Sequence, residues 1–191
     1  GHMSPHRSTI TNPNAAPFYI GNFNDTDRDI FGAFVERSIS LGEHMGLESG
    51  IRVNRVTMDS DPVSANLNPM NMMMGMPFMM NNMAGMLSNM NNASDLSQTD
   101  NNVDWFARLS IHTDSGTTWY VGAARKSRSP SYQERYLWIP LEATGGLADG
   151  KTYVGNPELD PEVSHEVELG FDYDGGDLSF YPRIFYKEVS D

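Results

Sequence analysis

The chain contains no cysteine, few basic residues and no long apolar segment, and each absence excludes a class of protein. Without cysteine among its 191 residues, it forms no disulfide, no cysteine-ligated zinc site and no thiol nucleophile. It has 13 Lys and Arg against 25 Asp and Glu, and the resulting net charge of -12 argues against nucleic acid as a partner. No run of 18 apolar residues occurs, so we predict no transmembrane helix.

The common catalytic motifs are also missing. The sequence contains no G-x-S-x-G, no H-E-x-x-H and no phosphate-binding P-loop. The five histidines are scattered, and His44, His112 and His165 fall in a turn, on a polar strand face and at a strand entry, where solvated side chains are common. We therefore predict that the chain is not an enzyme and carries no cofactor.

What the sequence does contain is a repeated alternation of apolar and polar residues, which is the pattern of a β-strand with two different faces. It occurs six times, in three pairs, and each pair surrounds a short turn that contains glycine. The first pair covers residues 31–41, where only Arg37 interrupts the apolar face, and residues 45–54. The second covers residues 103–112 and 118–124, and the third residues 166–173 and 178–187.

The lengths of the connections indicate how these strands are used. The turns within pairs, at residues 42–44, 114–116 and 174–176, are short, whereas the connections at residues 57–101 and about 127–163 are long. Short turns on one side and long loops on the other are typical of an outer-membrane β-barrel, whose tilted strands of about ten residues span the bilayer. A soluble β-sandwich is the alternative, but its strands and loops are usually shorter.

The barrel hypothesis predicts which residues share a face of one antiparallel sheet, because successive side chains of a strand point to opposite sides. Aromatic residues near the strand ends would form interfacial girdles. Pro182 is awkward in either fold, since it removes a ladder donor. The predicted apolar face comprises Phe31, Val35, Leu47, Ile51, Trp105, Leu109, Val121, Leu169, Phe171, Phe180 and Ile184. The predicted polar face comprises Glu36, Glu48, Arg52, Arg108, Glu168 and Asp172.

Two segments resemble a known family, the TonB-dependent outer-membrane receptors. Residues 125–136, RKSRSPSYQERY, are similar to the family's R-G-F-R-A-P-S-x-x-E-L-Y segment, and residues 155–170, GNPELDPEVSHEVELG, to its G-N-P-x-L-x-P-E-x-S-x-x-x-E-L-G segment. The start of the first strand, residues 29–36, is also family-like. In the second segment Glu158, Glu162 and Glu166 could bind ions, but pairing with arginines such as Arg125 and Arg128 is the more ordinary role.

The resemblance implies an all-β fold, namely antiparallel strands of a transmembrane outer-membrane barrel in a Gram-negative bacterium. Family barrels have about 22 strands with a plug domain inside, so we expect residues 1–191 to be a fragment of about six strands with long extracellular loops and without the plug. Import in the family is driven by a TonB-type energy-coupling protein. That protein, reached through the plug, and outer-membrane lipid are therefore the expected partners.

One segment of the first long loop, residues 58–100, has a composition of its own, because methionine and asparagine dominate it. Thioether sulfur is a soft, neutral ligand that favours Cu(I) over Zn²⁺, Ca²⁺ or Fe³⁺. Residues 136–147 are also similar to a loop of copper-receptor members of the family. We therefore expect Cu(I) to be the transported ligand. The candidate metal ligands are Met70, Met72, Met73, Met74, Met76, Met79, Met80, Met83, Met86 and Met90.

Other interpretations of this composition stay open. Methionine is a flexible apolar side chain that serves peptide and partner binding, and a Met/Asn-rich loop can be merely disordered. The favoured function is energy-coupled uptake of a metal or metal complex. The alternatives are a passive porin-like or adhesive barrel whose loop only contacts partners, and a soluble metal-binding β-protein.

The apolar face generates a prediction about autonomy. A sheet with one face made for lipid and two unpaired edges invites aggregation in water. We expect that the isolated chain, in buffer without detergent, does not form a stable monomer in sedimentation experiments. A monomer that melts in one sharp cooperative transition there would contradict the barrel hypothesis.

Overall fold

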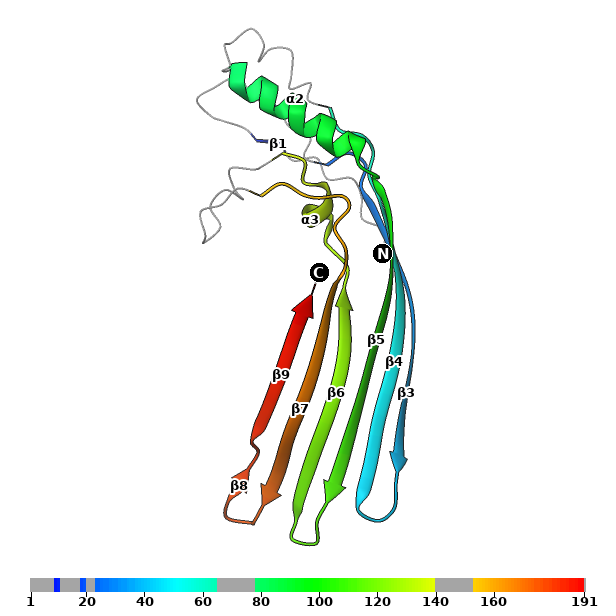
Figure 1. Cartoon of the computed structure of the whole chain (residues 1–191), viewed down its shortest axis with the longest axis vertical. Helices are drawn as coiled ribbons and strands as arrows, with labels where there is room; N and C mark the ends of the chain where they lie inside the picture. The colour runs from blue at the N-terminus through cyan, green and yellow to red at the C-terminus, as the bar shows by residue number, and fades with distance from the viewer. Residues whose placement is uncertain (1–8, 11–17, 20–22, 65–77, 140–152, 191) are drawn as a thin grey trace. The chain divides into compact units, whose positions relative to one another are not determined.

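The computed structural model describes residues 9–10, 18–19, 23–64, 78–139 and 153–190 (Figure 1). The chain divides into two compact units, which are treated separately below. The sheet unit comprises Phe31–Arg55, Asp100–Ser129 and Asp160–Asp191, and the loop unit comprises Gly1–Ile30, Val56–Thr99 and Pro130–Leu159. The elements are β1 (Thr9–Ile10), β2 (Phe18–Tyr19), β3 (Asp27–Ser40), β4 (Met45–Asp59), α2 (Phe78–Ala93), β5 (Ser97–His112), β6 (Thr117–Arg128), α3 (Tyr132–Tyr136), β7 (Glu162–Asp174), β8 (Ser179–Phe180) and β9 (Arg183–Ser190).

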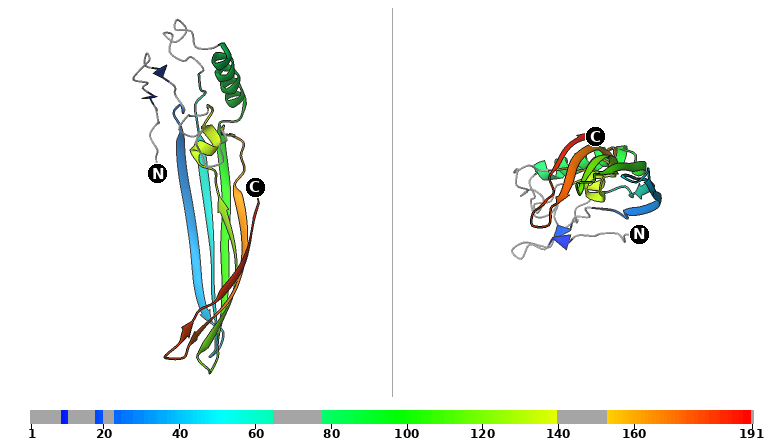
Figure 2. Two further views of the ribbon diagram at one scale, coloured as in Figure 1. Left: turned by 90° about the vertical axis from the view of Figure 1, so that its left-hand side faces the viewer. Right: turned by 90° about the horizontal axis from the view of Figure 1, so that it is seen from below.

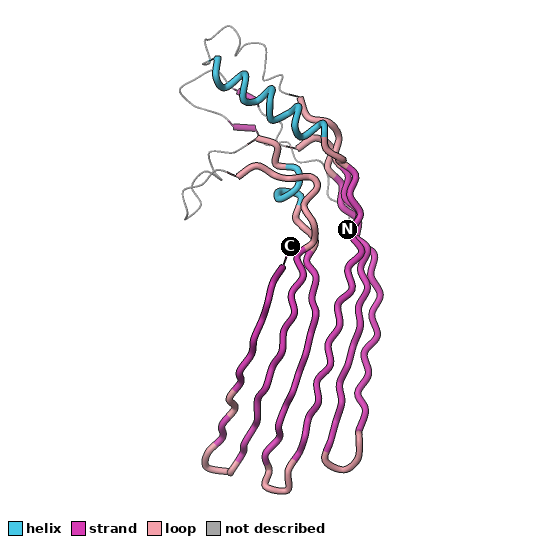
Figure 3. The backbone as a smooth tube through the Cα atoms, in the orientation of Figure 1, coloured by secondary structure: helices cyan, strands magenta, loops and turns pink. Residues whose placement is uncertain are grey.

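The long strands form one antiparallel sheet, as the alternation predicts. Its order is β3-β4-β5-β6-β7-β8, and β9 pairs with β7 after β8. The three short turns lie at the same end of the sheet, and the strands together follow a curve (Figures 2 and 3). Gly42, Gly116 and Gly176 have positive φ angles, which glycine adopts without strain, so each tight turn contains one residue suited to it. The predicted antiparallel barrel strands are therefore confirmed.

The register confirms the predicted faces. Leu109 lies opposite Val121, which lies opposite Leu169, and Leu169 lies opposite Ile184, so the four share one face. On the other face Arg108, Gly122 and Glu168 form a row. In the first hairpin the Arg52 guanidinium lies 5.5 Å from the centre of the Phe34 ring, which places the even positions of β3 and β4 together. Below, the two sides are called the apolar face and the polar face.

The apolar face is exposed in the structure although its side chains are hydrophobic. Val121 is 50% exposed, Leu169 46% and Ile184 69%. Near the short turns, aromatic rings pack along this face, with 4.8 Å between the ring centres of Trp119 and Phe171 and 5.9 Å between those of Phe171 and Phe180. A face of this kind suits lipid, and the rings match the interfacial girdle expected for a barrel.

The sixth predicted strand is interrupted, and Pro182 is the reason. The strand is divided into β8 and β9, with Tyr181 and Pro182 between them, yet the register with β7 is the same on both sides. The Phe171 amide donates to the Pro182 carbonyl over 3.3 Å, but proline has no N–H to donate in return. The Arg183 guanidinium supplies that donor, because its Nη1 lies 3.0 Å from the Phe171 carbonyl oxygen.

The two long connections contain helices that the alternation could not reveal. The predicted connection over residues 57–101 is shorter, because β4 continues to Asp59 and β5 begins at Ser97, and α2 occupies sixteen residues of it. Methionine, leucine and alanine favour helices, but a low-complexity composition obscures a helical period. The other connection contains α3. Among the described residues, no helix combines the length and hydropathy needed to cross a membrane.

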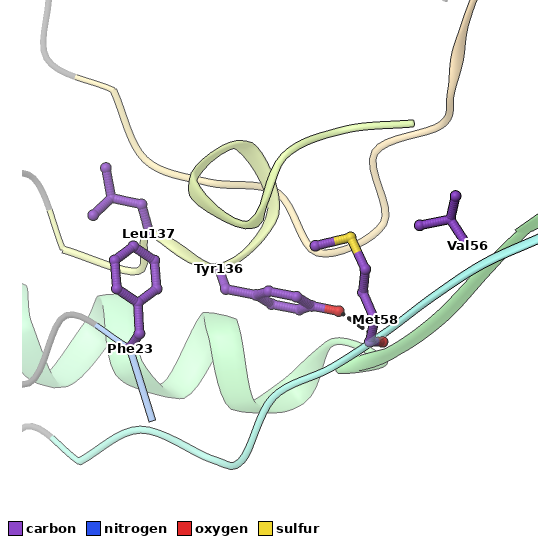
Figure 4. Close-up of a cluster of buried hydrophobic side chains, with 5 residues drawn as sticks. All are labelled: Phe23, Val56, Met58, Tyr136 and Leu137. Atoms are coloured by element: carbon purple, nitrogen blue, oxygen red, sulfur yellow. Dashed lines mark hydrogen bonds between the residues drawn. The ribbon is translucent and has the colours of Figure 1, made fainter. Parts of the chain in front are cut away.

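The loop unit has a small buried core. The Tyr136 hydroxyl lies 3.1 Å from the carbonyl oxygen of Met58 and 3.0 Å from that of Leu96, so its single proton lies between two backbone acceptors. Figure 4 shows the hydroxyl directed at the Met58 backbone. The core therefore joins the end of β4 to α3 within this unit. Its buried members are Phe23, Val56, Met58, Tyr136 and Leu137, with Leu96 and Tyr132 packed against them.

The contact between Arg183 and the strand opposite it leads to a prediction. In the Pro182→Ala variant, the alanine amide can donate to the Phe171 carbonyl. Arg183→Ala should therefore lower the free energy of unfolding less in that variant than in the wild-type protein. We expect the difference to be about 1 kcal/mol, the scale of an unsatisfied backbone acceptor. Denaturant unfolding of the four proteins of this double-mutant cycle in lipid vesicles measures it. The ion pairs of Arg183 are lost in both backgrounds and cancel, and equal costs would contradict the donor role.

Candidate functional site: methionines, signature segments and the polar face

The ten predicted metal ligands fall into three groups. Met70, Met72, Met73, Met74 and Met76 lie outside the described residues. Met79, Met80 and Met83 belong to α2, and only their backbone is described. The last two, Met86 and Met90, also belong to α2, where their side chains are 56% and 61% exposed. Residues four apart on a helix are neighbours on one face, so two exposed thioethers lie side by side.

The face by which α2 packs explains this exposure. Among the residues of α2 whose side chains are described, 85–93, the buried ones are the polar Ser88 and Asn91, and Met86 and Met90 are exposed. The neighbouring Asn92 fixes the helix to the backbone of Val63, because its amide donates to the Val63 carbonyl and accepts from the Val63 N–H, both at 2.8 Å. The described part of α2 is therefore attached to the loop unit through a side-chain amide, and the thioethers of Met86 and Met90 stay accessible to solvent.

Harder metal ligands do not compete with these thioethers in the described structure. Within those residues, no group of three or more His, Cys, Asp or Glu is arranged to hold a metal ion. The helix itself has no acidic residue in its first turn and no basic residue in its last. The chemistry that Met86 and Met90 offer is that of a neutral, soft donor pair.

The two signature segments contact each other in the loop unit, which the sequence alone could not show. In the first segment, Ser131 caps α3 through a capping box: its hydroxyl accepts from the Glu134 amide at 3.2 Å, and its own amide donates to the Glu134 carboxylate at 2.7 Å. The cap ends the extended chain after the buried Pro130 and directs Arg135 and Tyr136 into the unit. The first segment is thus a packing motif.

The second segment lies directly against α3. The Gly155 amide donates to the Leu137 carbonyl at 2.7 Å, and the Asn156 amide donates to the Glu134 carbonyl at 2.8 Å. A Cβ atom at Gly155 would lie 2.7 Å from the Arg135 carbonyl oxygen, a backbone atom. Only glycine fits there, which explains why the segment begins with this residue.

The buried Arg135 connects three parts of the loop unit. Its Nη2 donates to the Leu159 carbonyl at 2.8 Å, and its Nη1 lies 3.6 Å from the sulfur of Met58. Met58 was not among the predicted metal ligands, and it is completely buried beside a cation. Its thioether is therefore part of the core and not a candidate metal ligand.

The ordinary role predicted for the glutamates of the second segment is confirmed for Glu162. Its carboxylate oxygens lie 2.8 Å and 2.9 Å from the Arg128 guanidinium across β6 and β7. Arg125 has other partners, the carbonyl of Val103 and, at 3.1 Å, the hydroxyl of Ser127. These side chains stabilise the ends of strands and do not form an ion site.

A cluster on the polar face was missed by sequence reasoning. The guanidinium carbons of Arg108 and Arg183 lie 4.2 Å and 4.9 Å from the centre of the Tyr120 ring. Arg183 also lies 2.6 Å from Asp172 and 3.4 Å from Glu168. Alternation placed some of these residues on one face but could not bring them into contact. The available signal was Gly170, which lies opposite Arg183 and leaves room for it.

Comparisons with known proteins agree with this geometry. A family model described as "TonB dependent receptor-like, beta-barrel" matches residues 3–191. No curated protein matches the chain significantly. Among solved structures, the chain is similar to one titled "Copper transporter OprC", with a TM-score of 0.63 and 19% identity over 97% of this chain. The match covers 25% of that structure, so this chain spans about a quarter of its length, and at this identity the likeness shows the fold alone.

The close contact at Gly155 gives a prediction. Gly155→Ala should destabilise the receptor by about 1–3 kcal/mol, the usual cost of overpacking, because the rigid backbone of Arg135 must move. Gly85→Ala is the matched control, since nothing lies within 4 Å of a Cβ there and alanine favours the helix. Denaturant unfolding in detergent compares the two variants. If both were equally stable, the contact between the signature segments would not hold the loop unit together.

Proposed function

The chain belongs to the family of TonB-dependent receptors, and on that premise we propose that it forms part of the barrel wall of an outer-membrane receptor for energy-coupled uptake of copper. The observation that carries the copper proposal is the methionine-rich segment, ten methionines between residues 70 and 90, together with the exposed thioethers of Met86 and Met90. Family membership supports a transporter of the Gram-negative outer membrane, and not an enzyme.

The chemistry of the thioether supports Cu(I) as the cargo. A thioether has no proton to lose and no charge, so it binds soft ions and leaves Zn²⁺ and Fe³⁺ to harder ligands. By the helical repeat, positions 79 and 83 fall on the same face of α2 as positions 86 and 90. Four methionine positions on one face offer sets of three sulfurs, which suit the low coordination numbers of Cu(I).

The remaining steps of uptake involve partners of the barrel. Copper captured outside would pass along the polar face, which lines the lumen in a barrel whose apolar face contacts lipid. Release would depend on a plug domain and on a TonB-type energy-coupling protein. These partners are proposed on the basis of family membership.

A second candidate function has one observation in its favour. Exposed methionines on a helix also suit contact with peptides or proteins, because the side chain is flexible and polarizable. A passive or adhesive barrel would use α2 in this way. A methionine-to-leucine substitution distinguishes the two functions, because leucine keeps the apolar contact and removes the sulfur. Partner contact should survive the substitution, whereas copper binding should not.

The experiment is therefore a methionine-to-leucine replacement in the receptor. Replacing Met79, Met83, Met86 and Met90 by leucine should lower Cu(I) affinity by at least about tenfold, measured by titration against a competing chelator, and should slow copper uptake by cells. A variant with leucine at Met70, Met72, Met73, Met74 and Met76 tests the other part of the segment. Neither Zn²⁺ nor Fe³⁺ should compete in the wild type.

Met45→Leu is the control, because Met45 lies on the apolar face of β4. Undiminished Cu(I) affinity in both sets of variants would exclude the nine replaced thioethers as ligands and leave partner contact as their role. Lost affinity with unchanged uptake would make the segment an accessory to transport.

A further inference from the structure

The described glycines on the polar face of the sheet are covered by their neighbours, with one exception. The space above each is taken by a side chain that would clash with an added Cβ: Asn54 at Gly32, Ser110 at Gly46, Phe106 at Gly50 and Arg183 at Gly170. In these four places a neighbouring side chain accounts for the glycine, because a larger residue would displace it.

Gly122, in the middle of β6, is the exception. A Cβ there would meet only the Ala107 carbonyl oxygen and the Glu168 Cβ, both at 3.8 Å, which is an ordinary contact distance. Its φ angle is not positive, so the backbone does not require glycine either. Glycine inside a strand weakens it. Neither packing nor conformation in the described structure accounts for this glycine, which points to an occupant of the space above it.

That space is a hollow with a volume of about 130 Å³. Its floor is Gly122 and Ala124. Two rows of the register cross it: Phe106, Ala124 and Glu166 form one, and Arg108, Gly122 and Glu168 form the other. The hollow therefore has an aromatic ring and an arginine on the β5 side and two carboxylates on the β7 side, and Tyr120 also lines it.

The charges around the hollow favour a cation. Arg108 turns to the Tyr120 ring, and Glu168 pairs with Arg183. Glu166 is half-buried, and the structure gives it neither a hydrogen bond nor an ion pair with any described residue, although Lys187 lies opposite it in the ladder. Within the described residues, the Glu166 carboxylate thus lines the hollow together with the Phe106 ring and makes no ion pair in this structure.

We propose that this hollow binds one organic cation, a primary ammonium or guanidinium group, with Glu166 as its counter-ion and Phe106 as its aromatic wall. A cation over an aromatic face and beside a carboxylate gains from both contacts when it is partly desolvated. The site consists of residues other than the methionines of α2, and the proposal does not depend on copper as the cargo. In a barrel it would place a positively charged solute, or part of one, against the lumen wall.

A cysteine reporter tests the proposal, since the chain has no cysteine of its own. Ala124→Cys puts a thiol on the floor and leaves Gly122 empty. In the detergent-solubilised receptor, a cationic aminoethyl methanethiosulfonate should modify it faster than the anionic sulfonatoethyl reagent, relative to a Ser110→Cys reference. Ser110 suits this purpose because its row, Tyr120, Gly170 and Arg183, contains no carboxylate. We expect a preference on the order of tenfold, the scale by which charged clefts concentrate counter-ions.

Binding in the hollow is then detected as protection of the Ala124→Cys thiol from modification. n-Butylammonium should slow the modification of Ala124→Cys, whereas butyrate should not. Glu166→Gln should remove both the protection and the preference for the cationic reagent, and Glu48→Gln, elsewhere on the polar face, should change neither. Gly122→Val should abolish protection by filling the hollow, in a strand where valine is favoured.

Three results would overturn the proposal. Protection by butyrate would mean that the site prefers anions. Equal modification by both reagents without protection would mean that the hollow is empty space. A thiol that reacts only after unfolding would mean that another segment of the receptor fills it. None of these readouts involves copper, so their failure and that of the copper proposal are distinguishable.

Discussion

Backbone hydrogen bonding in a medium without water is the constraint on which the rest of this structure depends. In hydrocarbon, an unpaired N–H or C=O costs several kcal/mol, so a spanning strand must find all its partners in the sheet. Pro182 breaks that rule within the third hairpin, and Arg183 restores it by donating to the Phe171 carbonyl. An arginine on the polar face can do this because Gly170 leaves the space above the strand open. The same side chain then contacts Tyr120, Asp172 and Glu168.

The loop unit follows a different principle, because ordinary burial holds it together. Its core is formed around α3, and the two segments that resemble the receptor family are the two sides of one packing contact. Ser131 begins the helix, Arg135 and Tyr136 take buried acceptors, and Gly155 permits the approach of the second segment. These four residues of the two signature segments are thus explained by packing in this unit. They say nothing about the cargo.

The proposed functions occupy different chemical environments. The methionines of α2 are neutral and soft, and the described part of the helix packs through Ser88, Asn91 and Asn92 with its thioethers exposed. The polar face of the sheet is charged and aromatic, and the hollow above Gly122 is lined there by Glu166, which makes no ion pair with a described residue. A soft metal ion and an organic cation therefore have separate candidate sites, and neither site requires the other.

Local patterns determined the strands, their faces and their turns. Period-2 alternation is a property of consecutive residues, and a register shift by one would move every apolar side chain to the polar face. For this reason alternation alone is enough to place residues such as Val121, Leu169 and Ile184 on one face. The sequence also located Pro182 as a conflict, but not its solution, since Arg183 reaches the strand opposite.

Contacts between residues distant in the chain were decided only by the tertiary structure. Helix α2 lay hidden in a low-complexity segment, because methionine and asparagine do not mark its inner and outer faces. The contact of α3 with Gly155 joins two segments, and the ring of Tyr120 between two arginines and the hollow above Gly122 each join three. Such contacts depend on distances across strands and on which side chains fill which spaces, and a linear pattern contains neither.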